Sequence, residues 1–113
     1  MSTYEGKGKI LRIFINENTR YENILLYEAI VKRAFEQGLA GSMVFRGVEG
    51  FGFCCPSCRT RSEGMTISSC QPMVIEFIDT ETKLNELIPV VRGMVKTGAI
   101  ILQDADIILN RFE

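Results

Sequence analysis

The sequence predicts an α+β fold of the ferredoxin-like type, with the element order β-α-β-β-α-β. Two long segments carry apolar side chains at helical spacing, and the shorter segments around them alternate in polarity or are mostly apolar, as strands are. Glycine, proline and polar residues separate these segments. Because 113 residues suffice for one hydrophobic core, we expect residues 1–113 to form a single domain.

The first part of the chain is predicted to hold a strand, a helix and a second strand. Residues 1–8 are expected to be a mobile arm, and residues 9–15 to be the first strand, with mostly apolar side chains on both faces. The polar turn that follows can cap a helix over residues 21–37, which Gly38 is suited to end. The second strand is expected over residues 42–49.

A long loop is predicted before the third strand. The loop, about residues 50–70, has no clear periodicity, and a loop of this length indicates either function or disorder. The third strand is expected over residues 73–78. A second helix is then expected over residues 81–97, with Asp79 or Thr80 as its cap.

The end of the chain is predicted to add the last strands. Pro89 should kink or divide the second helix, and Gly98 should stop it. A fourth strand is expected over residues 99–102, followed by an acidic turn over residues 104–106 and a short fifth strand over residues 107–109. The strands are apolar on both faces, yet both helices of this fold cover the same face. We therefore expect a homo-oligomer that covers the other face.

Composition excludes several classes of function. The formal charge of −1 gives no reason to expect nucleic acid as a partner. No apolar run approaches the roughly 20 residues that cross a bilayer, and no signal peptide is visible, so we expect a cytoplasmic location with reduced cysteines. The chain has no histidine and no evident pair of catalytic carboxylates, so we do not expect an enzyme.

The stretch over residues 41–58, GSMVFRGVEGFGFCCPSC, is the most distinctive in the chain. A strand that leads through glycines into a loop is a candidate functional site, although the glycines could also only shape a hairpin bend. The loop cysteines include one C-x-x-C and are candidates for a Zn²⁺ site or a redox disulfide. Without a second C-x-x-C or a histidine pair, they can equally be incidental; the four are Cys54, Cys55, Cys58 and Cys70.

Several sequence blocks together resemble the nitrogen-regulatory PII proteins. GLAGSMVFRGVEGFG over residues 38–52 is similar to the second PII strand, and IEFIDTET over residues 75–82 to the third strand and the start of the second helix. The resemblance is closer to a PII-like group known as a domain of unknown function, through GKGKILRI (residues 6–13), LYEAIVKRA (residues 26–34) and VKTG (residues 95–98). These blocks extend over nearly the whole chain.

This resemblance implies a ferredoxin-like homotrimer that binds an adenine nucleotide in the clefts between subunits. It also implies that a segment over residues 52–70 is a T-loop that contacts a membrane transporter or an enzyme. Carried over by position, the candidate ligand residues are the loop base, a strand glutamate and the turn after the second helix, with Arg46 as a further candidate. They are Arg46, Gly50, Phe51, Gly52, Glu76, Lys96, Thr97 and Gly98.

The chain also departs from the PII pattern. Its turn over residues 95–98 is shorter than the glycine-rich PII turn, and the paired C-terminal arginines of PII are reduced to Arg111. A nucleoside monophosphate or cyclic nucleotide is therefore easier to accommodate than ATP. Two alternatives stay open. Arg12, Arg46 and Glu76 can form ion pairs at a subunit interface or be sheet-edge charges instead of contacting ligand. The protein can also be a metal-binding trimer of the CutA-like type that uses the loop cysteines.

Overall fold

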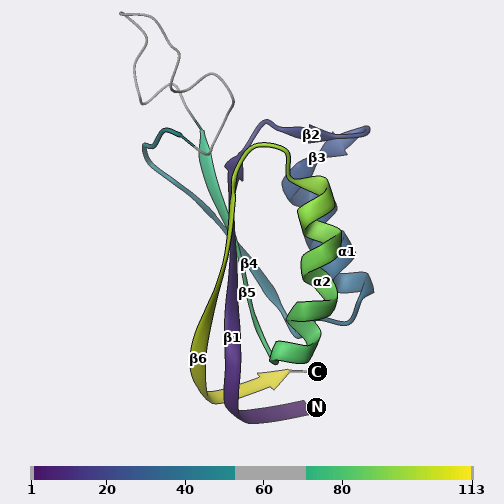
Figure 1. Ribbon diagram of the computed structural model, residues 1–113, viewed down its shortest axis with the longest axis vertical. Helices are drawn as coiled ribbons and strands as arrows, with labels where there is room; N and C mark the ends of the chain where they lie inside the picture. The colour runs from purple at the N-terminus through teal and green to yellow at the C-terminus, as the bar shows by residue number, and fades with distance from the viewer. Residues whose placement is uncertain (1, 53–70, 113) are drawn as a thin grey trace, which may run out of the picture.

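The computed structural model describes residues 2–52 and 71–112, which form one antiparallel sheet with two helices on one of its faces (Figure 1). A small two-stranded ribbon lies beside the start of the first helix. The strands are β1 (Ser2–Asn16), β2 (Arg20–Tyr21), β3 (Ile24–Leu25), β4 (Ser42–Arg46), β5 (Pro72–Asp79) and β6 (Ala99–Phe112), and the helices are α1 (Leu26–Glu36) and α2 (Glu81–Met94).

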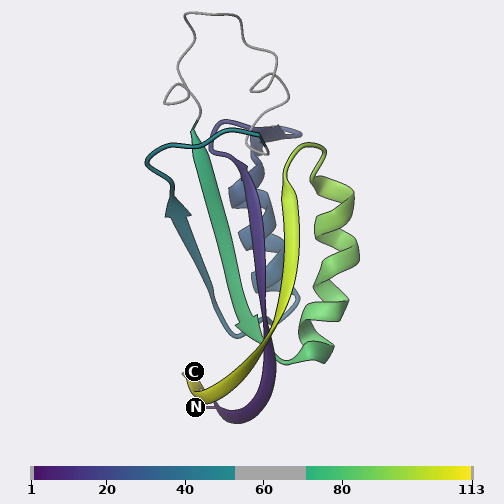
Figure 2. The ribbon, with the colours of Figure 1, turned by 60° about the vertical axis from the view of Figure 1, so that its left-hand side comes forward.

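The order of strands in the main sheet is β4-β5-β1-β6, and each neighbouring pair is antiparallel (Figure 2). Strand β1 lies inside the sheet between β5 and β6, so β4 and β6 are the two edges. Without the small ribbon, the chain follows the β-α-β-β-α-β order with this sheet arrangement. The ferredoxin-like prediction is confirmed.

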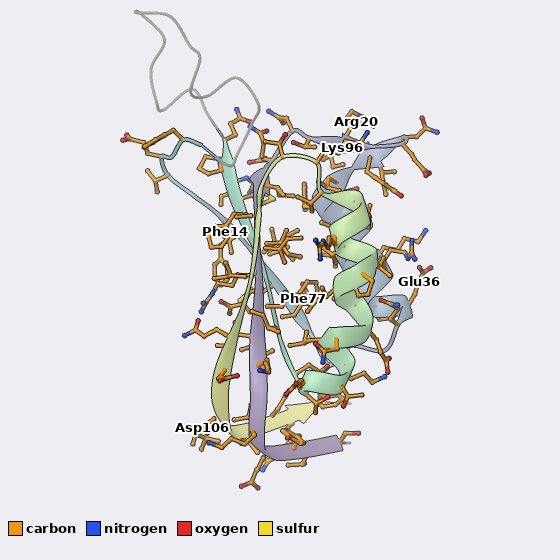
Figure 3. All side chains as sticks on the ribbon, viewed as in Figure 1. Phe14, Arg20, Glu36, Phe77, Lys96 and Asp106 are labelled. Atoms are coloured by element: carbon orange, nitrogen blue, oxygen red, sulfur yellow. The ribbon has the colours of Figure 1, made fainter. Side chains whose placement is uncertain are left out.

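The hydrophobic core lies between the helices and one face of the sheet. Alternate residues of β1 and β5 point into it, as the period of two in a strand requires. Phe77 of β5 is fully buried and points toward the helices in Figure 3. The core residues of the sheet are Leu11, Ile13, Ile15, Met73, Ile75 and Phe77, and the helices add Leu26, Ile30, Leu84, Leu87 and Val91.

The first helix begins later than the sequence predicts. Residues 20–25 form the β2–β3 hairpin instead of the first helical turns, and the side chain of Arg20 donates a hydrogen bond to the Asn23 carbonyl at 2.6 Å within it. Leu26, the first residue of α1, donates its backbone N–H to the Thr19 carbonyl at 2.8 Å. This bond closes the hairpin onto the helix, so the polar turn does not provide a side-chain cap. The helix ends before Gly38, as predicted.

Both ends of the chain are more regular than predicted. Residues 2–8 belong to β1 and pair with the end of β6, so they are not an arm. The acidic segment over residues 104–106 is part of a continuous β6 rather than a turn. The backbone pairing of β1 with β6 explains both differences. Cross-strand ion pairs accompany it, because the side chains of Asp104 and Asp106 lie 2.6 Å and 2.5 Å from the ammonium groups of Lys9 and Lys7.

The second helix begins where the sequence predicts, but it ends earlier than predicted. Thr80 is the N-cap, and its hydroxyl accepts a hydrogen bond from the Lys83 N–H at 3.3 Å. The helix ends at Met94, four residues before Gly98, and Pro89 does not divide it. Pro89 and Asn85 both lie on the exposed side, where water can bind the Asn85 carbonyl that proline leaves without a helical donor.

Strand β4 also ends earlier than predicted, at Arg46 rather than at residue 49. Within residues 2–52 and 71–112, no helix is long and apolar enough to cross a membrane.

Candidate functional site

The face of the sheet that the helices leave uncovered, called here the open face, is largely apolar. Its residues alternate with the core residues in β1, β4 and β5, and Phe14 of β1 points away from the helices in Figure 3. Several of its large side chains are well exposed, among them Phe45 and Met43, whose exposed fractions are 46% and 60%. The apolar residues of the open face include Ile10, Phe14, Met43, Phe45, Val74, Ile78, Ala99 and Ile101.

An ion pair lies in the middle of the open face. Arg12 and Glu76 are cross-strand neighbours in β1 and β5, and Nε of Arg12 lies 2.7 Å from Oε2 of Glu76. A second guanidinium nitrogen of Arg12 donates to Gln103 of β6 at 2.8 Å. The carboxylate of Glu76, which the sequence makes a candidate ligand group, therefore forms an ion pair within the chain rather than across a subunit interface. Both charged side chains are half-buried.

Arg46 at the end of β4 also forms an ion pair. Its Nε lies 2.7 Å from Oε1 of Glu17, which follows β1. This hydrogen bond and the attraction between the two charges lower the pKa of Glu17 and raise the pKa of Arg46. Because Glu17 also donates its backbone N–H to the Gln71 carbonyl, the pair ties the end of β4 to the end of β1 and to the start of β5.

The base of the long loop is packed against the start of β5. The Gly47 N–H donates to the Pro72 carbonyl at 2.8 Å, and a Cβ at Gly47 would lie 2.8 Å from the Pro72 ring. Gly50 lies over the same ring, and Phe51 next to it is half exposed. Gly52 is the last described residue before the segment over residues 53–70. The predicted loop-base residues are thus at the upper end of the sheet beside the β4 edge (Figure 1).

The turn between α2 and β6 contains the remaining predicted ligand residues. Lys96 lies at this turn at the upper end of the molecule (Figure 3), with Thr97 and Gly98 next to it. A cavity of about 350 Å³ lies under the turn, between α2 and β6, and Lys96, Gly98 and Arg92 all line it. Reasoning from sequence did not single out Arg92, although its place four residues before Lys96 was a usable signal.

The structure divides the predicted ligand residues among three places. Glu76 lines a separate cavity of about 320 Å³ on the open face. The loop base and the α2–β6 turn are at the same end of the sheet. Arg46, at the end of β4, is level with Ile15 of β1, because both pair with Met73 of β5. Ala99, the first residue of β6, pairs with Phe14, the neighbour of Ile15 in β1. The loop base and the turn are on opposite edges, however, and three strand spacings separate β4 from β6, about 14 Å. The described part of one chain therefore does not gather them into one site.

A further cavity, of about 510 Å³, lies beside the middle of β1 and β6, where residues 7–9 pair with residues 104–106. Its charged side chains neutralise one another: the hydrogen bond and charge of Asp106 raise the pKa of Lys7, and those of Asp104 raise the pKa of Lys9. Glu81 adds an ion pair to Lys9 at 3.8 Å. These lysines are held by carboxylates rather than directed at a ligand.

The four cysteines, Cys54, Cys55, Cys58 and Cys70, lie outside the described residues. Within the described part of the chain, no three side chains of metal-ligating types gather into a cluster. The zinc hypothesis stays a prediction. Its test is to incubate the reduced protein with Zn²⁺, desalt it and measure the metal that is retained.

Comparisons with known proteins place the chain in a family. Residues 8–107 match DUF190, described as "Uncharacterized ACR, COG1993". The chain belongs to the DUF190 family. A UPF0166 protein of Aquifex aeolicus (strain VF5) is 34% identical over 103 residues, which cover 90% of this chain and 94% of that protein. UPF0166 protein MJ1524 of Methanocaldococcus jannaschii is 31% identical over 104 residues, covering 89% and 92%.

Solved structures of PII-like proteins share the fold of this DUF190 chain. A protein of Thermus thermophilus described as PII-like in signalling has a TM-score of 0.58 at 16% identity, over 96% of this chain and 94% of that one. CPII of Thiomonas intermedia K12, solved with ADP, AMP and acetate, has a TM-score of 0.58 at 14% identity, over 95% and 92%. At these identities the likeness concerns the fold. The resemblance to the PII-like branch of unknown function is confirmed.

Proposed function

We propose that this DUF190 protein is a PII-like regulatory protein of the cytoplasm that acts by binding rather than by catalysis. It binds an adenine nucleotide or a similar small anion between the subunits of a homotrimer. It presents the segment over residues 52–70 to a partner protein, a membrane transporter or an enzyme. The observation that carries the proposal is the position of the predicted ligand residues, at one end of the sheet but on opposite edges.

A ring of subunits can bring the loop base and the α2–β6 turn together. When copies associate head to tail, the β6 edge of one subunit meets the β4 edge of the next, and such contacts close into a ring if the rotation allows it. Each cleft then combines the α2–β6 turn of one subunit with the loop base of its neighbour. The number of three subunits follows the resemblance to PII. The apolar open face supports the same assembly, because a ring can bury it.

The α2–β6 turn of one subunit and the loop base of its neighbour supply the groups that an anionic ligand needs. Lys96 provides a cation, and the backbone N–H groups of the glycine-rich loop base can donate to phosphate or ribose oxygens. CPII of Thiomonas intermedia, solved with ADP and AMP, has the same fold, which supports an adenine nucleotide as the ligand. Ligand in the cleft would contact the residues at which the segment over residues 52–70 begins. A nucleotide that binds one arrangement of this segment more tightly shifts its population.

The proposal is tested by calorimetric titration of the purified protein with AMP, ADP, ATP and cyclic AMP. We expect at least one of them to bind, and Lys96→Gln to weaken its affinity roughly tenfold, because a charge-assisted hydrogen bond is lost. The matched control is Lys32→Gln, which removes an exposed lysine of α1 and should leave the affinity unchanged. If none of the four nucleotides binds at millimolar concentration, the proposal is wrong.

A further inference from the structure

The cavity between α2 and β6 has an apolar floor and a positively charged rim. Its volume is about 350 Å³, at the small end of the range of about 300–1,000 Å³ for ligand pockets. The floor consists of core and edge side chains of β1, α2 and β6, while Arg92 and Lys96 form the rim. The apolar side chains that line the floor are Ile88, Val95, Ile100, Ile101 and Leu102, and the fully buried Leu11 lies beneath them.

The two rim cations have no partner within the described chain. Neither the guanidinium of Arg92 nor the ammonium of Lys96 makes a hydrogen bond or an ion pair there, and both residues are exposed. Lys9 and Arg12 on the same sheet are engaged by carboxylates. No acidic residue of the described chain lines this cavity to compete for an anion.

We propose that Arg92 and Lys96 together bind the phosphate of a nucleotide that carries a single phosphate group, and that the apolar floor contacts its base. Two cations balance the nearly doubly charged phosphomonoester. The planar guanidinium of Arg92 can donate two parallel hydrogen bonds to it, which an ammonium cannot do. This inference rests on the proposed function and adds Arg92 to the residues that bind the phosphate.

The form of the turn argues against a longer phosphate chain. Sites for di- and triphosphates typically surround them with successive backbone N–H groups of a glycine-rich loop. Here the turn over residues 95–98 has one glycine, Gly98, and a Cβ there would already lie 2.4 Å from the Phe14 carbonyl oxygen. The backbone of the turn is thus packed against β1 rather than free to surround additional phosphates.

The experiment uses calorimetry to compare AMP and ATP binding to the wild-type protein and to three variants. Arg92→Gln should weaken AMP binding at least about tenfold, and Arg92→Lys should restore part of the loss, because lysine returns the charge without the paired hydrogen bonds. Arg33→Gln is the matched control, since it removes an exposed arginine of α1 that has no ion pair within the described chain. Thermal unfolding without ligand shows whether each variant is folded.

The outcomes separate this inference from the proposed function. If the wild-type protein binds AMP more tightly than ATP and only the Arg92 variants lose AMP affinity, the inference is supported. If AMP binds equally well to the wild-type protein and to Arg92→Gln, or if ATP binds more tightly than AMP, the inference is overturned while the nucleotide function stands. If the wild-type protein binds neither AMP, ADP, ATP nor cyclic AMP, both are overturned.

Discussion

At Gly98, both the backbone φ angle and the close approach of neighbouring atoms exclude a side chain. Its φ is +153°, and an added Cβ would lie 2.4 Å from the backbone oxygen of Phe14. We expect Gly98→Ala to lower the free energy of unfolding by about 1–3 kcal/mol, because the turn must move away from β1. Gly93→Ala is the control: Gly93 lies in α2 with open space around its Cα, so alanine should stabilise the helix by up to about 1 kcal/mol. Urea unfolding measures both, and equal effects would contradict this explanation.

The pair of Glu17 with Arg46 makes part of the stability depend on pH. Because Arg46 lowers the pKa of Glu17 in the folded state, the pair stabilises the fold above the ordinary value of 4.5 and loses this effect as the pH falls through the folded pKa. We therefore expect Glu17→Gln to reduce the fall in melting temperature between about pH 6 and pH 3. Glu36→Gln, which removes a glutamate without an ion pair in the described chain, should follow the wild-type profile. Identical profiles for all three proteins would contradict the prediction.

At the scale of elements, helix α2 is held by its buried side rather than by its own helix propensity. It contains Pro89 and Gly93, both unfavourable in helices, yet it is continuous from Glu81 to Met94. Leu84, Leu87 and Val91 on one side are fully buried against the sheet. The packing of this side therefore outweighs the missing hydrogen bond at the proline.

Leu84→Ala tests this explanation for α2. Leu84 is fully buried, so we expect its truncation to lower the free energy of unfolding by about 2–5 kcal/mol through lost burial and the remaining cavity. The neighbouring exposed Asn85 provides the control, because Asn85→Ala should change stability by no more than about 0.5 kcal/mol. Denaturant unfolding that gave similar losses for the two variants would contradict the role assigned to the buried side.

At the scale of the whole molecule, the open face predicts how copies associate. Phe45→Asp places a charge among the apolar residues of this face, and we expect it to dissociate the proposed homotrimer, as measured by light scattering after size-exclusion chromatography. Phe35→Asp makes the same change on α1, on the helix side of the sheet, where the phenylalanine is 83% exposed, and should leave the trimer intact. A trimer that survives Phe45→Asp and dissociates with Phe35→Asp would place the subunit contact on the helices instead.

The sequence predicted what depends on short-range patterns. The alternation of side-chain polarity in the strands indicated the β-α-β-β-α-β order and the apolar open face. Thr80 was recognisable as a cap because it precedes a segment with apolar side chains at helical spacing. Local patterns predicted an arm and a turn at residues 2–8 and 104–106, and both predictions were wrong. Both segments are strands because β1 and β6 pair along this whole stretch, with Lys7 opposite Asp106, 99 residues away in the sequence.

Tertiary structure alone decided how the site residues are placed. Arg46 and Glu76 are candidate ligand residues in the sequence, and the fold gives each an ion-pair partner: the sheet register brings Arg12 to Glu76, and the end of β1 brings Glu17 to Arg46. The strand order β4-β5-β1-β6 puts the loop base and Lys96 on opposite edges, which no spacing in the sequence reveals. Residue type and period thus determined the elements and their apolar faces. Pairing between distant strands determined which strand charges are neutralised, as at Lys9, Arg12 and Arg46, because register depends on the packing of the whole sheet.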